Sequence, residues 1–153
     1  MITVKHLYKS FNDHIILNDI SIIFETGKTN LIIGRSGSGK TVLLKSIVGL
    51  HDIDSGEIWF GDVLFNKLSF TEKKKIRQEM GMLFQGSALF DSLTVEQNVR
   101  FPLDMFTVQA SEEKRERVNF CLQRVNLTNA NDLFPSELSG GMKKRVAIAR
   151  AIS

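Results

Sequence analysis

The chain has 153 residues, 42% of them hydrophobic and 24% charged, with 20 lysines and arginines against 17 aspartates and glutamates and one cysteine. This composition indicates one globular domain with a hydrophobic core, excludes a disordered or collagen-like chain, and indicates a cytoplasmic protein because one cysteine cannot form an internal disulfide. A net charge of +3 is too small to indicate a nucleic-acid-binding surface, and without a long apolar run or a signal-like start we expect neither a membrane-spanning helix nor a secretory signal.

The first half of the chain contains the patterns of β-strands. Residues 2–6 and 20–24 each place apolar side chains two positions apart, as a strand with one buried face requires. The apolar run at residues 30–33 predicts a central strand covered on both faces, and residues 80–84 predict another buried strand. The first half is therefore expected to be rich in strands.

The remaining elements are a hairpin and helices. Residues 57–65 turn at Gly61, which predicts a tight hairpin. The charged residues 71–79 predict a helix that faces solvent. Ser111 is expected to cap a helix whose apolar residues recur at helical spacing over residues 118–125. The second half is therefore expected to be mainly helical.

A glycine-rich segment lies between the predicted strand at 30–33 and a helix that is expected over residues 42–48 and to end at Gly49. The segment matches the phosphate-binding pattern of two glycines, a lysine and a hydroxyl residue at Gly34, Gly39, Lys40 and Thr41. Glycines let successive backbone N–H groups face one anion, and the helix N-terminus adds positive charge. We expect Lys40 to reach the β- and γ-phosphates and the Thr41 hydroxyl to bind Mg²⁺. The alternative is a glycine turn that precedes a helix without any ligand.

A second glycine motif begins the last predicted helix. Residues 138–142 read Leu-Ser-Gly-Gly-Met and precede an amphipathic helix over residues 143–151. Ser139 and the two glycines form another helix N-terminus at which an anion can bind. Taken alone, the same residues are a loop and a helix cap. Two such helix starts in one small domain favour anion binding over two coincidental caps.

The motifs GRSGSGKT (34–41), LFQ (83–85) and LSGGMKKRVAIARA (138–151), in this order and spacing, resemble the ATP-binding subunit of ABC transporters. The resemblance runs through the whole chain and implies an α/β fold, a P-loop NTPase core with an antiparallel β subdomain and a helical subdomain, incomplete at the C-terminus. It implies a single ABC ATP-binding domain over residues 1–153, with a β-rich P-loop core at 1–84, a helical lobe at 85–137, and the signature motif and its helix at 138–153.

The resemblance also implies ATP and Mg²⁺ as cofactors and a role for individual residues. Lys40 and Gln85 would act in catalysis, and Thr41 and Gln85 would bind the metal. Gln85 would also contact the attacking water and link the site to the helical lobe. Phe11 would stack on adenine, and Ile16 would pack near the base. The phosphates would be held by Gly34, Arg35, Ser36, Gly37, Ser38, Gly39, Lys40, Thr41 and Val42, and the ATP of a second subunit would be contacted by Ser139, Gly140 and Gly141.

Within the family, residues 81–103 and Met142 are similar to the ATPase of Mla-type systems, which carry phospholipid between the bacterial inner and outer membranes. The helical lobe of the family holds a groove for a short cytoplasmic helix of the membrane subunit, and Phe101 or Phe106 would line it. The alternative for apolar residues such as Val95 is a role in the core of the lobe alone.

Two features depart from the family pattern. Val42 replaces the hydroxyl residue that commonly follows the P-loop, so one contact to the α-phosphate would be missing. The chain ends at Ser153, before the positions of the Walker B aspartate, the catalytic glutamate, the D-loop and the switch histidine. We therefore expect an incomplete sheet, and weak nucleotide binding with little or no hydrolysis by these residues alone.

The sequence thus predicts the ATP-binding subunit of an ABC transporter, which couples ATP binding and hydrolysis to the transport of phospholipid. Its expected partners are an integral-membrane permease and a second copy of the same subunit, with no nucleic acid. Its expected location is cytoplasmic, peripheral on the inner face of the bacterial cytoplasmic membrane. The alternatives are a soluble ABC-type ATPase that acts on ribosomes or DNA, and a nucleotide-binding fragment without catalytic activity.

Overall fold

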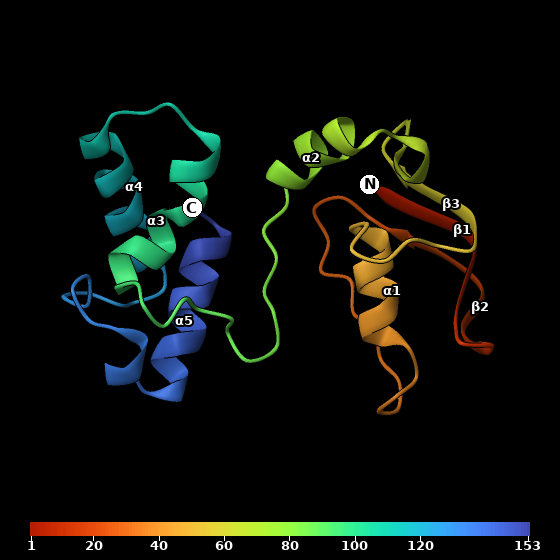
Figure 1. Cartoon of the computed structure of the whole chain (residues 1–153), viewed down its shortest axis with the longest axis horizontal. Coiled ribbons are helices and arrows are strands. Elements are labelled where there is room, and N and C mark those ends of the chain that lie inside the picture. The colour runs from red at the N-terminus through yellow and green to blue at the C-terminus, as the bar shows by residue number, and fades with distance from the viewer. The chain divides into compact units, whose positions relative to one another are not determined.

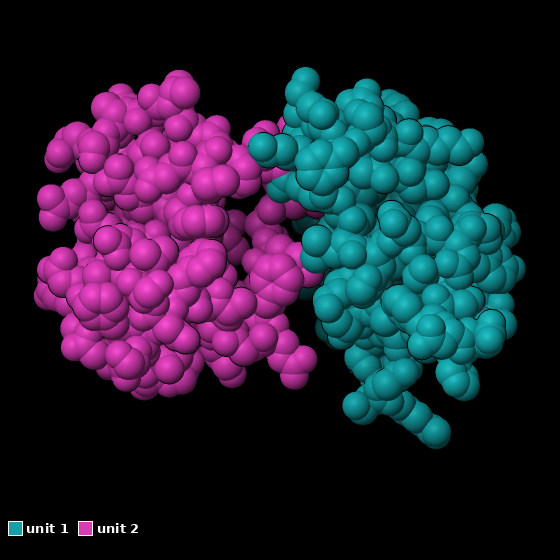
Figure 2. Space-filling view, in the orientation of Figure 1, with its two compact units in different colours: residues 1–77 teal, residues 78–153 magenta.

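The computed structural model describes all 153 residues. They form two compact units, Met1–Arg77 and Gln78–Ser153, which are drawn in different colours in Figure 2. The first unit contains the β-sheet and helix α1, and the second contains helices α3, α4 and α5 (Figure 1). Each unit has its own hydrophobic core.

The sheet of the first unit has four antiparallel strands in the order β2-β1-β3-β4. The strands are β1 (Ile2–Phe11), β2 (His14–Phe24), β3 (Ser55–Phe60) and β4 (Val63–Leu64). β1 and β2 form a long hairpin in which Phe11 pairs with His14 across a two-residue turn, and both turn residues have positive φ angles. The predicted strands at 2–6 and 20–24 are confirmed, and the hairpin extends both of them.

The short hairpin between β3 and β4 confirms the turn predicted at Gly61. Trp59 pairs with Leu64, and Phe60 pairs with Val63. Gly61 has a φ angle of 58°, a conformation that glycine adopts without steric cost. On its other edge β3 pairs with β1, so the hairpin is part of the main sheet.

Helix α1 (Lys40–Ile47) ends where the sequence predicts. Gly49 has a φ angle of 72°, its N–H donates to the Ser46 carbonyl (3.0 Å), and the Leu50 N–H donates to the Lys45 carbonyl (2.7 Å). These bonds satisfy carbonyl groups that the end of the helix would leave unpaired. The apolar face of α1 contributes to the core of the first unit, which consists of Val4, Leu7, Leu17, Leu43, Ile47, Ile58 and Phe65.

Helix α2 (Phe70–Gln78) confirms the helix predicted at 71–79 and has no buried residue. The Arg77 side chain donates to the carbonyls of Val48 (2.9 Å) and Gly49 (2.7 Å). These hydrogen bonds attach α2 to the segment that follows α1.

The two apolar runs that predicted buried strands do not form strands. Residues 30–33 and 80–84 have extended or irregular backbone, and neither pairs with any of the four strands. The side chains of Leu31 and Ile33 are 79% and 84% exposed. An apolar run becomes a strand when neighbouring strands satisfy its backbone groups, and neither run has such a neighbour in the structure.

The second unit is a bundle of three helices, α3 (Val95–Phe106), α4 (Ser111–Arg124) and α5 (Gly140–Ala151). Thr94 caps α3 in a reciprocal arrangement, because its hydroxyl accepts from the Gln97 N–H while the Gln97 side chain accepts from the Thr94 N–H. The core consists mainly of Val95, Val99, Leu103, Val118, Cys121, Leu122, Leu127, Val146 and Ala149. The longest helix, α4, has 14 residues, and no helix is both long and apolar enough to span a bilayer.

The expected cap of α4 at Ser111 is wrong by one residue. Ala110 occupies the cap position, and its N–H donates to the Glu113 carboxylate (3.1 Å). The Ser111 hydroxyl instead accepts a hydrogen bond from the Arg100 guanidinium of α3 (3.1 Å). The Ser111 side chain, which the local sequence assigns to a helix cap, therefore contributes to the contact between α3 and α4.

Candidate functional site

The glycine-rich segment is a curled loop whose backbone N–H groups are available to a ligand. Gly37 and Gly39 have φ angles of 78° and 86°, and the Ser38 N–H closes a turn on the Arg35 carbonyl (3.2 Å). No side chain caps α1. The first backbone hydrogen bond of the helix runs from the Leu43 N–H to the Gly39 carbonyl (2.8 Å). Among residues 37–42, only the Ser38 N–H donates to an acceptor in the protein. The remaining N–H groups gather at the positive end of a helix, where an anion is stabilised.

At two glycines of this loop, a side chain would lie close to neighbouring atoms. A Cβ atom on Gly39 would lie 3.1 Å from the carbonyl oxygen of Ile16 and 3.2 Å from a methyl group of Leu17. A Cβ atom on Gly34 would lie 2.7 Å from the Ser38 hydroxyl. Gly39 is therefore required for the loop to close against β2, whereas a methyl group at Gly34 needs only a rotation of the Ser38 hydroxyl.

We expect Gly39→Ala to lower the free energy of unfolding by about 2 kcal/mol, because the left-handed conformation costs an alanine about 1–2 kcal/mol and Ile16 leaves its methyl group too little room. Gly37→Ala is the matched control: its φ angle is also positive, but nothing lies within 4 Å of the added methyl group. Urea unfolding of both variants measures the difference. Equal destabilisation by the two substitutions would show that contact with β2 does not matter.

The Lys40 side chain turns back over the loop. Its Nζ donates to the carbonyl oxygens of Gly34 (2.7 Å) and Arg35 (2.6 Å). The ammonium group is therefore held beside the free N–H groups, where it adds positive charge to the same site. Thr41 is exposed in the first turn of α1, so its hydroxyl is accessible to a metal ion bound to phosphate.

Val42 is directed to the protein interior. Its side chain is partly buried and packs against the core of the first unit. The family resemblance implies that a hydroxyl residue at this position would contact the α-phosphate. Valine cannot make this contact and contributes to the core instead. Its backbone N–H remains with the other free N–H groups at the start of α1.

The two residues expected to contact the base lie in different surroundings. Ile16 lies against Gly39 and thus beside the loop. The Phe11 ring is 40% exposed and meets the His51 ring edge-on, with 5.4 Å between centroids, while Lys9 Nζ lies 5.0 Å from the centre of the Phe11 ring. The stacking of adenine on Phe11 remains a prediction.

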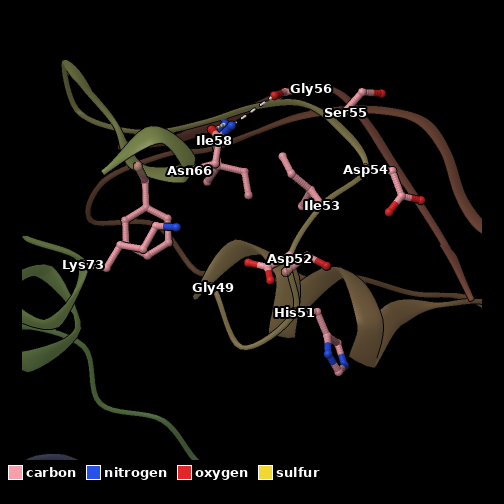
Figure 3. Close-up of a pocket in the computed structure, with 12 residues that line it drawn as sticks. Gly49, His51, Asp52, Ile53, Asp54, Ser55, Gly56, Ile58, Asn66 and Lys73 are labelled. Carbon is pink, nitrogen blue, oxygen red and sulfur yellow. Dashed lines mark hydrogen bonds between the residues drawn. The ribbon is translucent and has the colours of Figure 1, made fainter. Parts of the chain in front are cut away.

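A cavity of about 180 Å³ lies beside the C-terminal part of α1 (Figure 3). The Ser46 hydroxyl lines it, is 1% exposed and has no hydrogen-bond partner in the protein. Asp54, on its wall, accepts from Lys9 Nζ (2.9 Å) and the Ser10 N–H (2.6 Å), and these bonds lower the pKa of its carboxyl. None of the residues expected to bind nucleotide lines this cavity, which has room for several water molecules.

Gln85 lies in the second unit and is exposed. The three residues that follow, Gly86, Ser87 and Ala88, all have positive φ angles, of 86°, 69° and 47°. Residue types do not predict this conformation, because serine and alanine rarely adopt it. The backbone turn presents the Gln85 side chain at the surface of the unit.

Asn98 is a structural residue that the sequence analysis missed. It is completely buried in α3, and its side-chain oxygen accepts from the Phe90 N–H (2.8 Å). Its amide group donates to the carbonyls of Phe90 (3.1 Å), Leu93 (3.0 Å) and Thr94 (2.9 Å). One side chain thus holds the segment between Gln85 and α3.

The second glycine motif forms a helix start, as predicted. Ser139 caps α5, and its hydroxyl accepts from the Met142 N–H (3.2 Å). Gly140 and Gly141 are exposed, and no atom lies closer than 4.0 Å to a Cβ atom built on either residue. A ligand can therefore approach the backbone of the first turn closely.

Comparison with known proteins identifies this combination of sites. The ABC transporter family model matches residues 17–153. The methionine import ATP-binding protein MetN of Clostridium tetani is 40% identical over an alignment that covers 100% of this chain and 48% of MetN. The intermembrane phospholipid transport system ATP-binding protein MlaF of Haemophilus influenzae is 41% identical and covered over 58% of its length. The chain thus spans about half the length of these relatives.

A solved structure supports the same relationship. The dimeric structure of a post-hydrolysis state of the ATP-binding cassette MJ0796, bound to ADP and Pi, superposes with a TM-score of 0.89 and 33% sequence identity. The superposition covers 99% of this chain and 69% of that one. With the phosphate-binding loop and the second glycine motif in place, the chain belongs to the ABC transporter family.

Proposed function

We propose that this chain is part of an ATP-binding subunit of an ABC transporter, in which binding and hydrolysis of ATP drive transport across a membrane. The observation that supports the proposal most strongly is the set of backbone N–H groups without a protein acceptor between Gly37 and Val42, with Lys40 Nζ beside them. Together they offer several donors and positive charge to the phosphates of ATP. The same loop fits Mg²⁺ through the accessible Thr41 hydroxyl, and the metal would neutralise charge on the phosphates.

Hydrolysis is proposed for the whole protein rather than for these 153 residues alone. Gln85 would position the attacking water, and the exposed position of its side chain supports this role. We propose that the chain by itself binds nucleotide with little or no turnover. A phosphate-release assay on the purified chain measures this, and a clear rate of ATP hydrolysis would contradict it.

The second subunit is proposed to be another copy of this one. The capped start of α5 at Ser139 would close over ATP held on the loop of the partner, with Gly140 and Gly141 allowing close approach. The dimeric solved relative with ADP and Pi supports this arrangement. Each ATP site would then combine Lys40 of one subunit with Ser139 of the other.

Complementation tests this composite site. In sedimentation velocity with Mg²⁺ and a non-hydrolysable ATP analogue, we expect the wild-type protein to dimerise and the variants Lys40→Ala and Ser139→Arg to remain monomeric. An equimolar mixture of the two variants keeps one intact composite site and should recover about half of the dimer. If the mixture behaves like either variant alone, the two motifs do not share a site.

We propose that the membrane partner docks on the second unit near Phe101. A surface cavity of about 420 Å³ is lined by Leu93, Glu96, Gln97, Arg100, Phe101 and Asp104. Phe101 is partly exposed and packs on Phe90 with 4.8 Å between ring centroids. An apolar ring with charged residues around it suits a short amphipathic helix. In co-purification with the permease, Phe101→Glu should abolish binding and leave nucleotide affinity unchanged.

Acid is expected to weaken the second unit through Asp104, which lies in this cavity. Burial raises the pKa of its carboxyl, but hydrogen bonds from Lys114 (3.0 Å) and Arg100 (3.1 Å) outweigh burial and hold the pKa below its ordinary value. The stabilisation is therefore complete above about pH 4, the unfolded value, and is lost as the pH falls through the folded pKa. Asp104→Asn should flatten the dependence of thermal stability on pH below pH 4. The exposed Asp91→Asn is the control, and an equal effect from it would contradict the assignment.

The transported substrate is proposed to be phospholipid. The resemblance of residues 81–103 to Mla-type ATPases and the 41% identity to MlaF support this substrate. The main alternative is methionine, which the 40% identity to MetN supports. The whole protein, purified with its membrane subunit in detergent micelles, should hydrolyse ATP faster when phospholipid is added, and stimulation by methionine instead would select the alternative. Co-purification with ribosomes or DNA in place of a permease would refute the transporter proposal.

A further inference from the structure

We propose that Arg150 is a positioning residue that holds the segment after Gln85 against helix α5. The inference rests on the proposed role of Gln85 at the ATP site and adds a residue to it. Arg150 lies in the last turn of α5, the same helix that begins at the Ser139 cap. Through Arg150, the segment after Gln85 and the helix that begins at Ser139 would move together.

The contacts of Arg150 go to the strained part of this segment. Its guanidinium donates to the Ala88 carbonyl (2.9 Å) and to the Ser87 carbonyl (3.2 Å). The guanidinium carbon also lies 5.7 Å from the centre of the Phe90 ring. The Arg150 side chain thus contacts two backbone carbonyls and one aromatic ring.

The backbone that Arg150 holds is unfavourable without such support. Ser87 and Ala88 have positive φ angles, and this conformation costs a residue other than glycine about 1–2 kcal/mol. Ser87 is also buried, so its carbonyl needs a donor within the protein. The two hydrogen bonds from Arg150 supply donors to both carbonyls and offset part of the strain.

The segment is held from a second direction by α3. Asn98 binds the N–H and carbonyl of Phe90, and the Ser87 N–H donates to the Phe84 carbonyl (3.2 Å). Gln85 lies between these fixed points, and its own side chain makes no hydrogen bond in the structure. Its position therefore depends on how firmly its neighbours are held, and Arg150 is the side chain whose hydrogen bonds join the residues after Gln85 to α5.

The chemistry requires arginine at this position. A planar guanidinium can donate to two carbonyls at once and stack on a ring, whereas a lysine ammonium is a point charge without a flat face. We therefore expect Arg150→Lys to retain the charge and still release the segment. Arg145 is the matched control on the same helix, because its guanidinium donates to the carbonyl of Asn126 (2.7 Å), away from Gln85.

Hydrogen exchange tests the contact itself on the full chain. In Arg150→Gln and Arg150→Lys, we expect the peptide that covers residues 85–90 to exchange at least tenfold faster, while peptides from α3 and α4 keep the wild-type rate. Arg145→Gln should leave residues 85–90 unchanged. Wild-type exchange in the Arg150 variants, or faster exchange throughout the second unit, would overturn the proposal.

Kinetics of the whole protein test the consequence for Gln85. We expect Arg150→Gln to lower kcat for ATP hydrolysis about tenfold with KM for ATP within twofold, and Arg150→Lys to recover less than a third of the lost kcat. An unchanged kcat alongside a loosened segment would overturn the positioning role. If the wild-type protein neither binds nor hydrolyses ATP, the proposed function fails, and the exchange experiment still decides whether Arg150 holds the segment.

Discussion

Replacement of Lys40 by alanine is expected to weaken the binding of ATP by about 10- to 100-fold. Lys40 Nζ lies beside the free N–H groups of the loop and is held there by the carbonyls of Gly34 and Arg35. A hydrogen bond to a charged group contributes about 1.5–3 kcal/mol, which corresponds to a change of roughly this size in affinity. Titration with a fluorescent ATP analogue in the presence of Mg²⁺ measures the effect.

Lys45→Ala is the control for the loss of charge. Lys45 lies on the same helix but outside the loop, so its removal should change the affinity less than twofold. Circular dichroism should show both variants folded. Equal losses from the two substitutions would mean that net charge rather than the loop binds ATP, and a wild-type affinity for Lys40→Ala would contradict the assignment of the site.

The largest effect on stability is expected from Asn98→Ala, which should lower the free energy of unfolding of the second unit by about 3 kcal/mol. The substitution removes four hydrogen bonds from a completely buried side chain. It leaves the Phe90 N–H and the Leu93 carbonyl without a partner in the protein, whereas the carbonyls of Phe90 and Thr94 keep the backbone N–H groups of Leu93 (3.1 Å) and residue 98 (2.9 Å). Each unsatisfied group costs about 1–3 kcal/mol unless water reaches it. Urea unfolding followed by hydrogen exchange in α3 measures the loss in this unit.

Asn119→Ala is the control for this prediction. Asn119 is exposed on α4 and accepts one hydrogen bond, from Asn131 (2.8 Å), so its substitution should cost less than about 1 kcal/mol. A similar cost for both variants would show that the segment between Gln85 and α3 does not depend on Asn98.

Local signals in the sequence predicted the elements whose structure is decided locally. The Gly61 hairpin, the end of α1 at Gly49 and the start of α5 at Ser139 each depend on residues within a few positions of one another. The phosphate-binding loop belongs to the same class, because its glycines and its lysine are adjacent in the chain. These elements could therefore be predicted from residue types and spacing alone.

Elements that depend on distant partners could not be predicted in this way. The apolar runs at 30–33 and 80–84 have the composition of buried strands, but the structure provides no neighbouring strand to pair with them. Arg150 contacts residues more than 60 positions away, and no local pattern in the sequence indicates these partners. The Ser111 cap failed for the same reason, because Arg100 of another helix binds its hydroxyl.

The claim on which the function depends is that the N–H groups around Lys40 bind the phosphates of ATP. Amide chemical shifts of the ¹⁵N-labelled protein, recorded during titration with ATP and Mg²⁺, test it most directly. We predict that the largest shifts occur at Gly37, Gly39, Lys40 and Thr41, and that inorganic pyrophosphate shifts the same signals. Saturation with ATP that leaves these four signals in place would contradict the account.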